Sequence, residues 1–360
     1  MSETVKEKHF DLGDFQKRLL PSENDIIAKW GGSLDTPIVS ILCITYNQKE
    51  YIEDAFRGFL FQKTEFPFEV VVHDDASTDG TTEIIQTYVK RYPKIFKPII
   101  QTENQYSQGR RPVSLAFKYM RGEFVAFCEA DDFWIDDLKL TKQVSAMAEY
   151  EDIDVAFHRA VLTDSDGRER MIGHYADAAS IISPSEIIQK KYRMIPTAST
   201  LIRSSALKEA VNFMLERPWL TVGDVYIHFF GCIRGGAFFD EAPMSVYQRN
   251  NSGSWSANSK KDFEKRLGHV DVRIRSYKDL NLLTKGAFMR DIKNANSKSV
   301  VKLLMNEQIP YFRRLALVWQ YRTDVRANAL IYVPVLFFPV LVRLARHLKK
   351  HSRHFGFINN

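Results

Sequence analysis

Short apolar runs alternate with helical patterns between residues 37 and 131, and no other feature limits the fold of this chain as strongly. The runs are brief and mostly β-branched or aromatic, and polar residues follow them, which is typical of buried strands. They cover residues 38–44, 68–73, 97–101 and 124–128, and helical spacing falls between them over 51–60, 82–92 and 113–120. Such alternation predicts an α/β fold, a Rossmann-like αβα sandwich with a mostly parallel central sheet.

Polar clusters directly follow three of the four predicted strands. They are Thr45-Tyr46-Asn47, Asp74-Asp75 and Glu129-Ala130-Asp131-Asp132. In open α/β sheets, ligands bind beyond the carboxyl ends of the strands. We therefore expect the three clusters to lie together and to form one site.

The acids after the fourth strand suggest a cation site. Carboxylates packed as closely as Glu129, Asp131 and Asp132 repel one another unless a cation neutralises them. Mg²⁺ and Mn²⁺ take oxygen ligands, often one or two carboxylates plus substrate phosphates. Two alternatives are a solvated loop and a helix N-terminus, where acids suit the helix dipole.

Several common enzyme classes lack support in the sequence. It contains no GxGxxG or GxxxxGK[ST], which argues against dinucleotide oxidoreductases and P-loop NTPases. It also contains no HExxH and no GxSxG, so zinc peptidases and serine hydrolases are not indicated. The three cysteines are widely spaced and form no CxxC pair, so we expect small buried residues.

Three segments in order resemble glycosyltransferase family 2 on a GT-A fold. They read PIVSILCITYN, VVVHDDASTDGT and GEFVAFCEADDFW. The resemblance is strong over residues 37–145, weaker to about residue 256, and does not cover the last hundred residues. It implies an inverting, metal-dependent glycosyltransferase that uses a nucleotide-sugar donor, with a UDP-sugar favoured.

The resemblance also assigns a donor site, position by position. It implies that Thr45, Tyr46, Asn47 and Asp75 contact the nucleotide base and that Asp74 lies near the ribose. Glu129-Ala130-Asp131 occupies the DxD position, where glutamate replaces the first aspartate. Asp131 and Asp132 are then the expected ligands of a divalent cation, Mn²⁺ or Mg²⁺.

The second half contains the remaining site candidates. The resemblance implies that Asp224 is the catalytic base, although Gly223 replaces the first acid of the usual pair. The alternative for Asp224 is a helix cap. Thr197, Ser199 and Trp255 are the acceptor-side candidates, and Arg249 is expected to pair with the diphosphate because a guanidinium suits phosphate geometry.

The ends of the chain differ in character from the middle. We expect a polar extension over residues 1–36, a GT-A domain over 37–258 and a helical region over 259–360. Within that last region, 329–342 is apolar and a basic cluster follows to residue 354, which suits contact with an anionic membrane. The alternative is a packed C-terminal helix. The net charge of +6 fits acidic or phosphate-bearing partners.

The predicted function is therefore sugar transfer to a hydroxyl of a saccharide or lipid-linked saccharide, in surface polysaccharide synthesis such as O-antigen or capsule. The expected location is cytoplasmic, with peripheral contact on the inner face of the cell membrane, and no nucleic-acid partner is expected. Two alternatives remain: a sugar nucleotidyltransferase, and an inactive GT-A-like membrane scaffold. No uninterrupted apolar run reaches the roughly 18 residues that a spanning helix requires.

Overall fold

The computed structural model describes residues 10–164, 166–189, 194–220, 223–249, 263–304, 306 and 309–326. The chain divides into two compact units, Met1–Asn258 and Ser259–Asn360.

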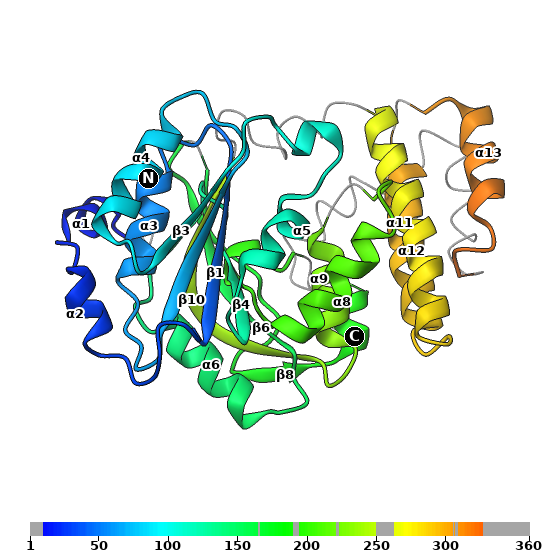
Figure 1. Cartoon of the computed structure of the whole chain (residues 1–360). Helices are drawn as coiled ribbons and strands as arrows, with labels where there is room; N and C mark the ends of the chain where they lie inside the picture. The colour runs from blue at the N-terminus through cyan, green and yellow to red at the C-terminus, as the bar shows by residue number, and fades with distance from the viewer. Residues whose placement is uncertain are drawn as a thin grey trace, which may run out of the picture. The chain divides into compact units, whose positions relative to one another are not determined.

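The first unit is built on one ten-stranded sheet (Figure 1). Its strands are β1 (Val39–Thr45), β2 (Phe68–Asp74), β3 (Phe96–Ile100), β4 (Phe124–Phe127), β5 (Phe133–Trp134), β6 (Val155–Asp164), β7 (Glu169–Ile172), β8 (Ser180–Ile182), β9 (Leu201–Arg203) and β10 (Ala237–Arg249). The order is β3-β2-β1-β4-β9-β6-β10-β5, with β7 beside β6 and β8 beside β10.

Most of the longer strands run in one direction. β1 pairs in parallel with β2 and β4, β2 with β3, and β6 with β10. β9 is antiparallel to both β4 and β6, so those two strands share a direction although β9 separates them. The carboxyl ends of the parallel strands therefore meet at one edge, as the αβα prediction requires.

Helices cover both faces of the sheet (Figure 1). The helices of this unit are α1 (Leu12–Lys17), α2 (Glu23–Ile27), α3 (Ile52–Leu60), α4 (Thr81–Arg91), α5 (Pro112–Ala116), α6 (Lys139–Glu149), α7 (Pro184–Ile188), α8 (Ser204–Leu215) and α9 (Asp224–Cys232). α3, α4 and α6 share one apolar core with the sheet, in which Ile41, Cys43 and Phe56 are fully buried. α5 and α8 lie against the opposite face (Figure 1).

One local prediction needs correction. The helix expected over 113–120 breaks into α5 and a 3₁₀ turn, η2 (Phe117–Tyr119). Another 3₁₀ turn, η3 (Thr197–Ser199), precedes β9. All three cysteines are free and buried, as the sequence predicts.

The polar segment before residue 37 is more ordered than its composition predicts. α1 and α2 both begin at side-chain caps, supplied by Asp11 and Ser22. Phe15 is buried in a cluster with Phe61, Phe133, Val161 and Val246. Each helix buries one apolar residue against the domain, Phe15 in α1 and Ile26 in α2, and such isolated contacts leave little periodic signal in the sequence.

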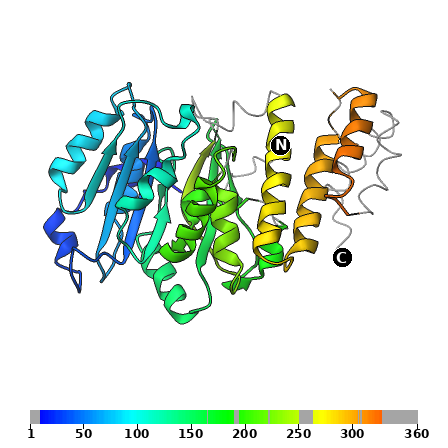
Figure 2. The same cartoon turned by 45° about the vertical axis from the view of Figure 1, so that its right-hand side comes forward.

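The second unit contains three helices in its described part: α11 (Phe263–Leu283), α12 (Met289–Leu304) and α13 (Tyr311–Tyr321). Figure 2 shows α11 and α12 side by side. The three helices enclose a small core that includes Ile274, Val300, Leu303, Leu317 and Tyr321. No helix in the described part of the chain is long and apolar enough to cross a membrane. The predicted membrane segment, 329–354, lies outside the described residues.

A buried polar group joins β1, β2 and the approach to β4. Glu69 is 1% exposed, accepts a 2.7 Å hydrogen bond from Ser40 Oγ and receives the Arg121 guanidinium at 2.6 Å. The Gly122 N–H donates to Ser40 Oγ at 2.8 Å. The close approach of the backbones requires glycine, because a Cβ on residue 122 would lie 2.4 Å from the Ser40 backbone nitrogen.

Gly122→Ala should therefore lower the free energy of unfolding by about 1–3 kcal/mol, the range that overpacking typically costs. Denaturant unfolding followed by circular dichroism measures the change. Gly31→Ala is the matched control, since its Cβ would meet only Glu65 O, at an ordinary 3.6 Å. Equal stability of the two variants would contradict the packing argument.

Candidate functional site

The acid cluster lies in a loop that extends the line of β4. After β4 ends at Phe127, the Cys128 N–H donates to Leu42 O and the Ala130 N–H donates to Ile44 O, both at 3.1 Å. The loop therefore stays beside β1 for three residues. It then turns through a hydrogen bond from the Asp132 N–H to Glu129 O at 2.9 Å.

Asp132 is the anchored member of the cluster. Its side chain is 1% exposed, and Oδ1 accepts a hydrogen bond from the Gln248 N–H of β10 at 3.1 Å. Oδ2 is buried and has no hydrogen-bond partner within the described residues. Burial, followed by the charges of Asp131 and Glu129, raises the pKa of Asp132 well above its usual range.

Glu129, Asp131 and Asp224 form a group of interacting acids. Glu129 is accessible to solvent, yet protein atoms surround it, and this partial desolvation raises its pKa. The charges of Asp131 and then Asp224 raise the pKa of Glu129 further. Desolvation also raises the pKa of Asp131, which is half-buried. α9 begins at Asp224, and the charge of this residue acts on Glu129 of the acid loop.

The oxygen ligands at this site suit a cation for which the protein supplies only some of the ligands. Within the described residues, no three His, Cys, Asp or Glu side chains are arranged to enclose a metal by themselves. What the cluster does offer is the carboxylate of Asp131 and the unpartnered Oδ2 of Asp132. One or two carboxylates with the remaining positions left to phosphate oxygens is the usual arrangement for Mg²⁺ and Mn²⁺.

Asp74 and Asp75 follow β2, beside the carboxyl end of β1. Asp74 is fully buried, and its carboxylate accepts from the Ser77 N–H at 3.0 Å, from Ser77 Oγ at 2.6 Å and from the Thr82 hydroxyl. These hydrogen bonds fix the conformation of the loop before α4, so the main role of Asp74 is to hold that loop.

Asp75 holds a second loop. It is 2% exposed, and its two carboxylate oxygens accept from the Gln105 N–H at 2.7 Å and the Tyr106 N–H at 3.0 Å. A carboxylate has about four acceptor positions. Asp75 can therefore keep these bonds and still accept one from a ligand.

The predicted residues at the end of β1 divide into buried and accessible ones. Thr45 is 2% exposed and its Oγ1 has no partner among the described residues. Asn47 has a left-handed backbone, with φ of 54°, and its side chain accepts from the Thr78 N–H at 2.8 Å. Tyr46 is 47% exposed, so it is the member of this group most available to stack on a ligand.

The second-half candidates are not all placed to touch substrate. Ser199 is fully buried and its hydroxyl donates to Pro196 O at 2.6 Å, whereas Thr197 is half-buried in η3. Arg249 forms a two-bond ion pair with Asp164, at 2.5 and 2.7 Å, so its guanidinium is already engaged by a carboxylate. Trp255 lies outside the described residues.

A buried lysine beneath the acid loop was missed by the sequence analysis. Lys139 is fully buried, its Nζ donates to Gln143 Oε1 at 2.7 Å and lies 4.1 Å from the centre of the Trp134 ring. Trp134 Nε1 donates to Ala198 O and Gln143 Nε2 donates to Ser199 O, each at 2.8 Å. These contacts link β5 and α6 to η3. The i,i+4 spacing of Lys139 and Gln143 was the signal available in the sequence.

Arg111 is a second residue that the sequence analysis missed. It is half-buried, and its Nε is buried without a hydrogen-bond partner within the described residues. Burial lowers its pKa, and Tyr226 and Tyr106 oppose that shift. Tyr226 belongs to α9, two residues after Asp224. Arg111 thus places a cation close to the helix that begins at Asp224.

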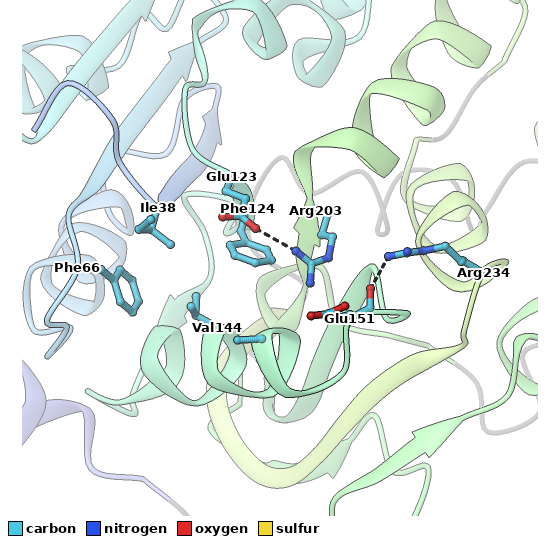
Figure 3. A pocket seen from close by; sticks show the side chains of 9 residues that line it. Ile38, Phe66, Glu123, Phe124, Val144, Glu151, Arg203 and Arg234 are labelled. Carbon is cyan, nitrogen blue, oxygen red and sulfur yellow. Dashed lines mark hydrogen bonds and ion pairs between the residues drawn. The ribbon is translucent and has the colours of Figure 1, made fainter. Parts of the chain in front are cut away.

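A hollow of about 630 Å³ lies elsewhere (Figure 3). Ile38 and Phe124, at the amino-terminal ends of β1 and β4, contribute to its lining, so it lies at the sheet edge opposite the acid loop. Its two arginines are paired, Arg203 with Glu123 at 3.0 Å and Arg234 with Asp154 at 2.6 Å. It contains none of the predicted donor-site residues.

Comparison with known proteins agrees with this geometry. Residues 40–210 match the sequence profile of the family described as "Glycosyl transferase family 2". The structure of Staphylococcus aureus TarS 1–349 in complex with UDP-GlcNAc has a TM-score of 0.62 to this chain, with 16% identity, and covers 89% of this chain and 93% of that one. At that identity the likeness establishes the fold, which is GT-A.

Sequence relatives include a named glycosyltransferase. An uncharacterized protein of Mycobacterium tuberculosis is 33% identical over 236 residues, 64% of this chain and 65% of the relative. The poly(ribitol-phosphate) beta-N-acetylglucosaminyltransferase TarS of S. aureus is 37% identical over 97 residues, 26% of this chain and 16% of that protein. Residues 40–210 are therefore a family 2 glycosyltransferase domain. The chain spans about two thirds, 65%, of the mycobacterial relative's length.

The buried lysine gives a pH-dependent prediction. Burial lowers the pKa of Lys139 to about 7, against 10.5 for an ordinary lysine. Between these pH values the unfolded chain holds a proton that the folded chain lacks, so raising the pH through this window stabilises the folded state. Wild type should therefore gain stability relative to Lys139→Met as pH rises from about 7 to about 10. Urea unfolding at several pH values measures this, with exposed Lys118→Met as control. A stability difference between wild type and Lys139→Met that does not change with pH would contradict this prediction.

Proposed function

We propose that this protein transfers a sugar, with inversion, from a nucleotide-sugar donor to a hydroxyl of a saccharide or lipid-linked saccharide acceptor. The observation that carries the proposal is the acid loop directly after β4, at the carboxyl edge of the sheet of a family 2 domain, with the charge of Asp224 acting on Glu129. TarS, which shares the fold, was solved with UDP-GlcNAc, and this supports a UDP-sugar as donor.

The donor would lie over the ends of β1, β2 and β4. Tyr46 is accessible for stacking on the base, and Asp75 keeps acceptor positions for the base or ribose. Asp131, with the unpartnered Oδ2 of Asp132, would hold Mn²⁺ or Mg²⁺. Such a cation supplies neutralisation of the charge on a departing diphosphate. Arg111, half-buried near α9, is better placed than Arg249 to add a positive charge there.

Asp224 is the proposed base. It stands at the first position of α9, half-buried, close enough to Glu129 for its charge to act on that carboxyl. It would accept the proton of the acceptor hydroxyl as that oxygen attacks the anomeric carbon. Thr197 is the accessible acceptor-side candidate, while Ser199 and Trp134 would position η3.

The two alternatives predict different chemistry. A nucleotidyltransferase would release pyrophosphate from a nucleoside triphosphate and a sugar phosphate, whereas the family match favours sugar transfer. An inactive scaffold would bind donor without turnover. The name of TarS describes transfer to a poly(ribitol-phosphate), which supports an acceptor within surface polymers. With such an acceptor, the proposed location is the cytoplasmic face of the membrane.

Asp131→Asn should weaken donor binding in the presence of Mn²⁺ about tenfold or more, because a charge-assisted contact contributes about 1.5–3 kcal/mol. Calorimetric titration of UDP-GlcNAc with Mn²⁺, and again with a chelator, measures the loss. Asp35→Asn removes the same charge at an exposed position and should change nothing. If Asp131→Asn retained full Mn²⁺-supported affinity, Asp131 would lose its assigned role.

Asp224→Asn should lower kcat about a hundredfold or more and leave the donor Kd nearly unchanged, because asparagine can still cap a helix and cannot take a proton. A coupled assay of UDP release, with saccharide acceptors supplied, gives kcat. Asp177→Asn, at a fully exposed acid, is the matched control. Wild-type turnover by Asp224→Asn would assign the residue to helix capping alone.

A further inference from the structure

The charge of the chain is divided unevenly between its two units. Residues 263–326 contain 14 Lys and Arg against 6 Asp and Glu, a net charge of +8, although the whole chain carries only +6. Residues 327–360 add five Lys and Arg and no acid. Residues 1–262 are therefore net acidic, and every excess positive charge belongs to the second unit.

Helix α13 of that unit has apolar residues on two opposite sides. Its inner side contributes Leu317, 4% exposed, and Tyr321, 2% exposed, to the core of the unit. The guanidinium of Arg314 holds the start of the helix by donating to Asn306 O at 2.8 Å and to Ile309 O at 3.0 Å. Since these contacts fix the rotation of α13, the opposite side is presented to solvent.

The outer side of α13 carries a stripe of large apolar residues. Phe312 is 81% exposed, Leu315 37% and Trp319 69%. Their spacing of three and then four residues places them on one face of the helix, which we call the outer stripe. Surface helices of globular units normally carry polar residues there. An exposed apolar face of this kind marks an interaction surface.

Arginines border the outer stripe on both sides. Arg322 packs its guanidinium 4.0 Å from the centre of the Trp319 ring and donates to Trp319 O at 2.7 Å. Arg313, on the other border, pairs with Glu264 at 2.7 Å. Aromatic residues flanked by arginines suit the headgroup level of a bilayer, where rings enter the apolar boundary and cations stay with anionic headgroups.

We propose that the outer stripe of α13 is a docking surface for an anionic lipid bilayer. A symmetric dimer through the stripe fits less well, because it would bring two basic units together, and like charges at a contact oppose binding. A bilayer with acidic headgroups is complementary to both features: its apolar region accepts the stripe, and its negative charge attracts a unit with a net charge of +8. The outer stripe includes no donor-site residue, so the proposal does not depend on the sugar-transfer reaction.

The test is co-sedimentation of the full chain with vesicles of phosphatidylcholine, with and without phosphatidylglycerol. Wild type should bind the phosphatidylglycerol vesicles, and added salt should weaken the binding. The double variant Phe312→Ser/Trp319→Ser should bind about tenfold less well or worse. Arg322→Glu should also bind less well. Leu215→Ser, at a 61% exposed leucine of α8, is the matched control and should bind as wild type does.

Three results would overturn the proposal. The first is equal vesicle binding by the double variant and wild type, with native folding of both shown by circular dichroism. The second is a dimer of wild type that the double variant loses in sedimentation equilibrium, which would make the stripe an interface between copies. The third concerns tryptophan fluorescence measured before vesicles are added. If Trp319→Phe removed no component that acrylamide quenches, the chain itself would cover the stripe.

UDP-GlcNAc titration of the same double variant separates this proposal from the catalytic one. Donor affinity should stay within about twofold of wild type, because no residue of the stripe belongs to the donor site. A loss of vesicle binding with donor affinity retained supports docking on its own. Joint loss of both would indicate a general folding defect and would contradict a separate docking surface.

Discussion

Backbone pairing of β1 with its two neighbours is the constraint on which the site depends. The register places Thr45 beside Asp74 on one side and Leu42 beside Phe127 on the other. Hydrogen bonds from Cys128 and Ala130 then continue this pairing past the end of β4. Three polar segments far apart in sequence are thereby held at one edge. Ser40, Glu69 and Gly122 hold the opposite edge of the same strands together.

The carboxylates at this edge repel one another when no cation neutralises them. Burial raises the pKa values of Glu129, Asp131 and Asp132, and the charges of neighbouring acids raise those of Glu129 and Asp132 further. One oxygen of Asp132 is buried without a hydrogen-bond partner among the described residues. Unpaired buried charge costs free energy unless a cation or a proton compensates it. A site with this property binds a cation together with its substrate more readily than a neutral loop would, which is why we connect it to a diphosphate donor.

The fold of residues 37–131 was predictable because apolar runs and turn residues agree with each other there. The four parallel strands and the acid cluster that follows β4 are located as the pattern indicates. Hydrogen-bond partners were not predictable, because they depend on contacts between distant residues. Asp74 and Asp75 look alike in sequence, yet one bonds the loop before α4 and the other the segment at Gln105.

The second half shows the same limit more strongly. Arg249 could be predicted as a cation, but its pairing with Asp164 follows from the register of β6 and β10, which no local pattern reveals. The buried Lys139 was missed because a lysine in a helix is normally placed on the solvent face. Its burial follows from the Trp134 ring and from Gln143, which the tertiary fold brings to it.

The most direct test of the central claim is an anomalous difference map from crystals grown with Mn²⁺ and a UDP-sugar. The account predicts one strong manganese peak within coordination distance of Asp131, with the nucleotide over the ends of β1 and β2 and Asp224 facing the sugar. A manganese peak or nucleotide elsewhere, such as in the hollow beside Arg203, would contradict it.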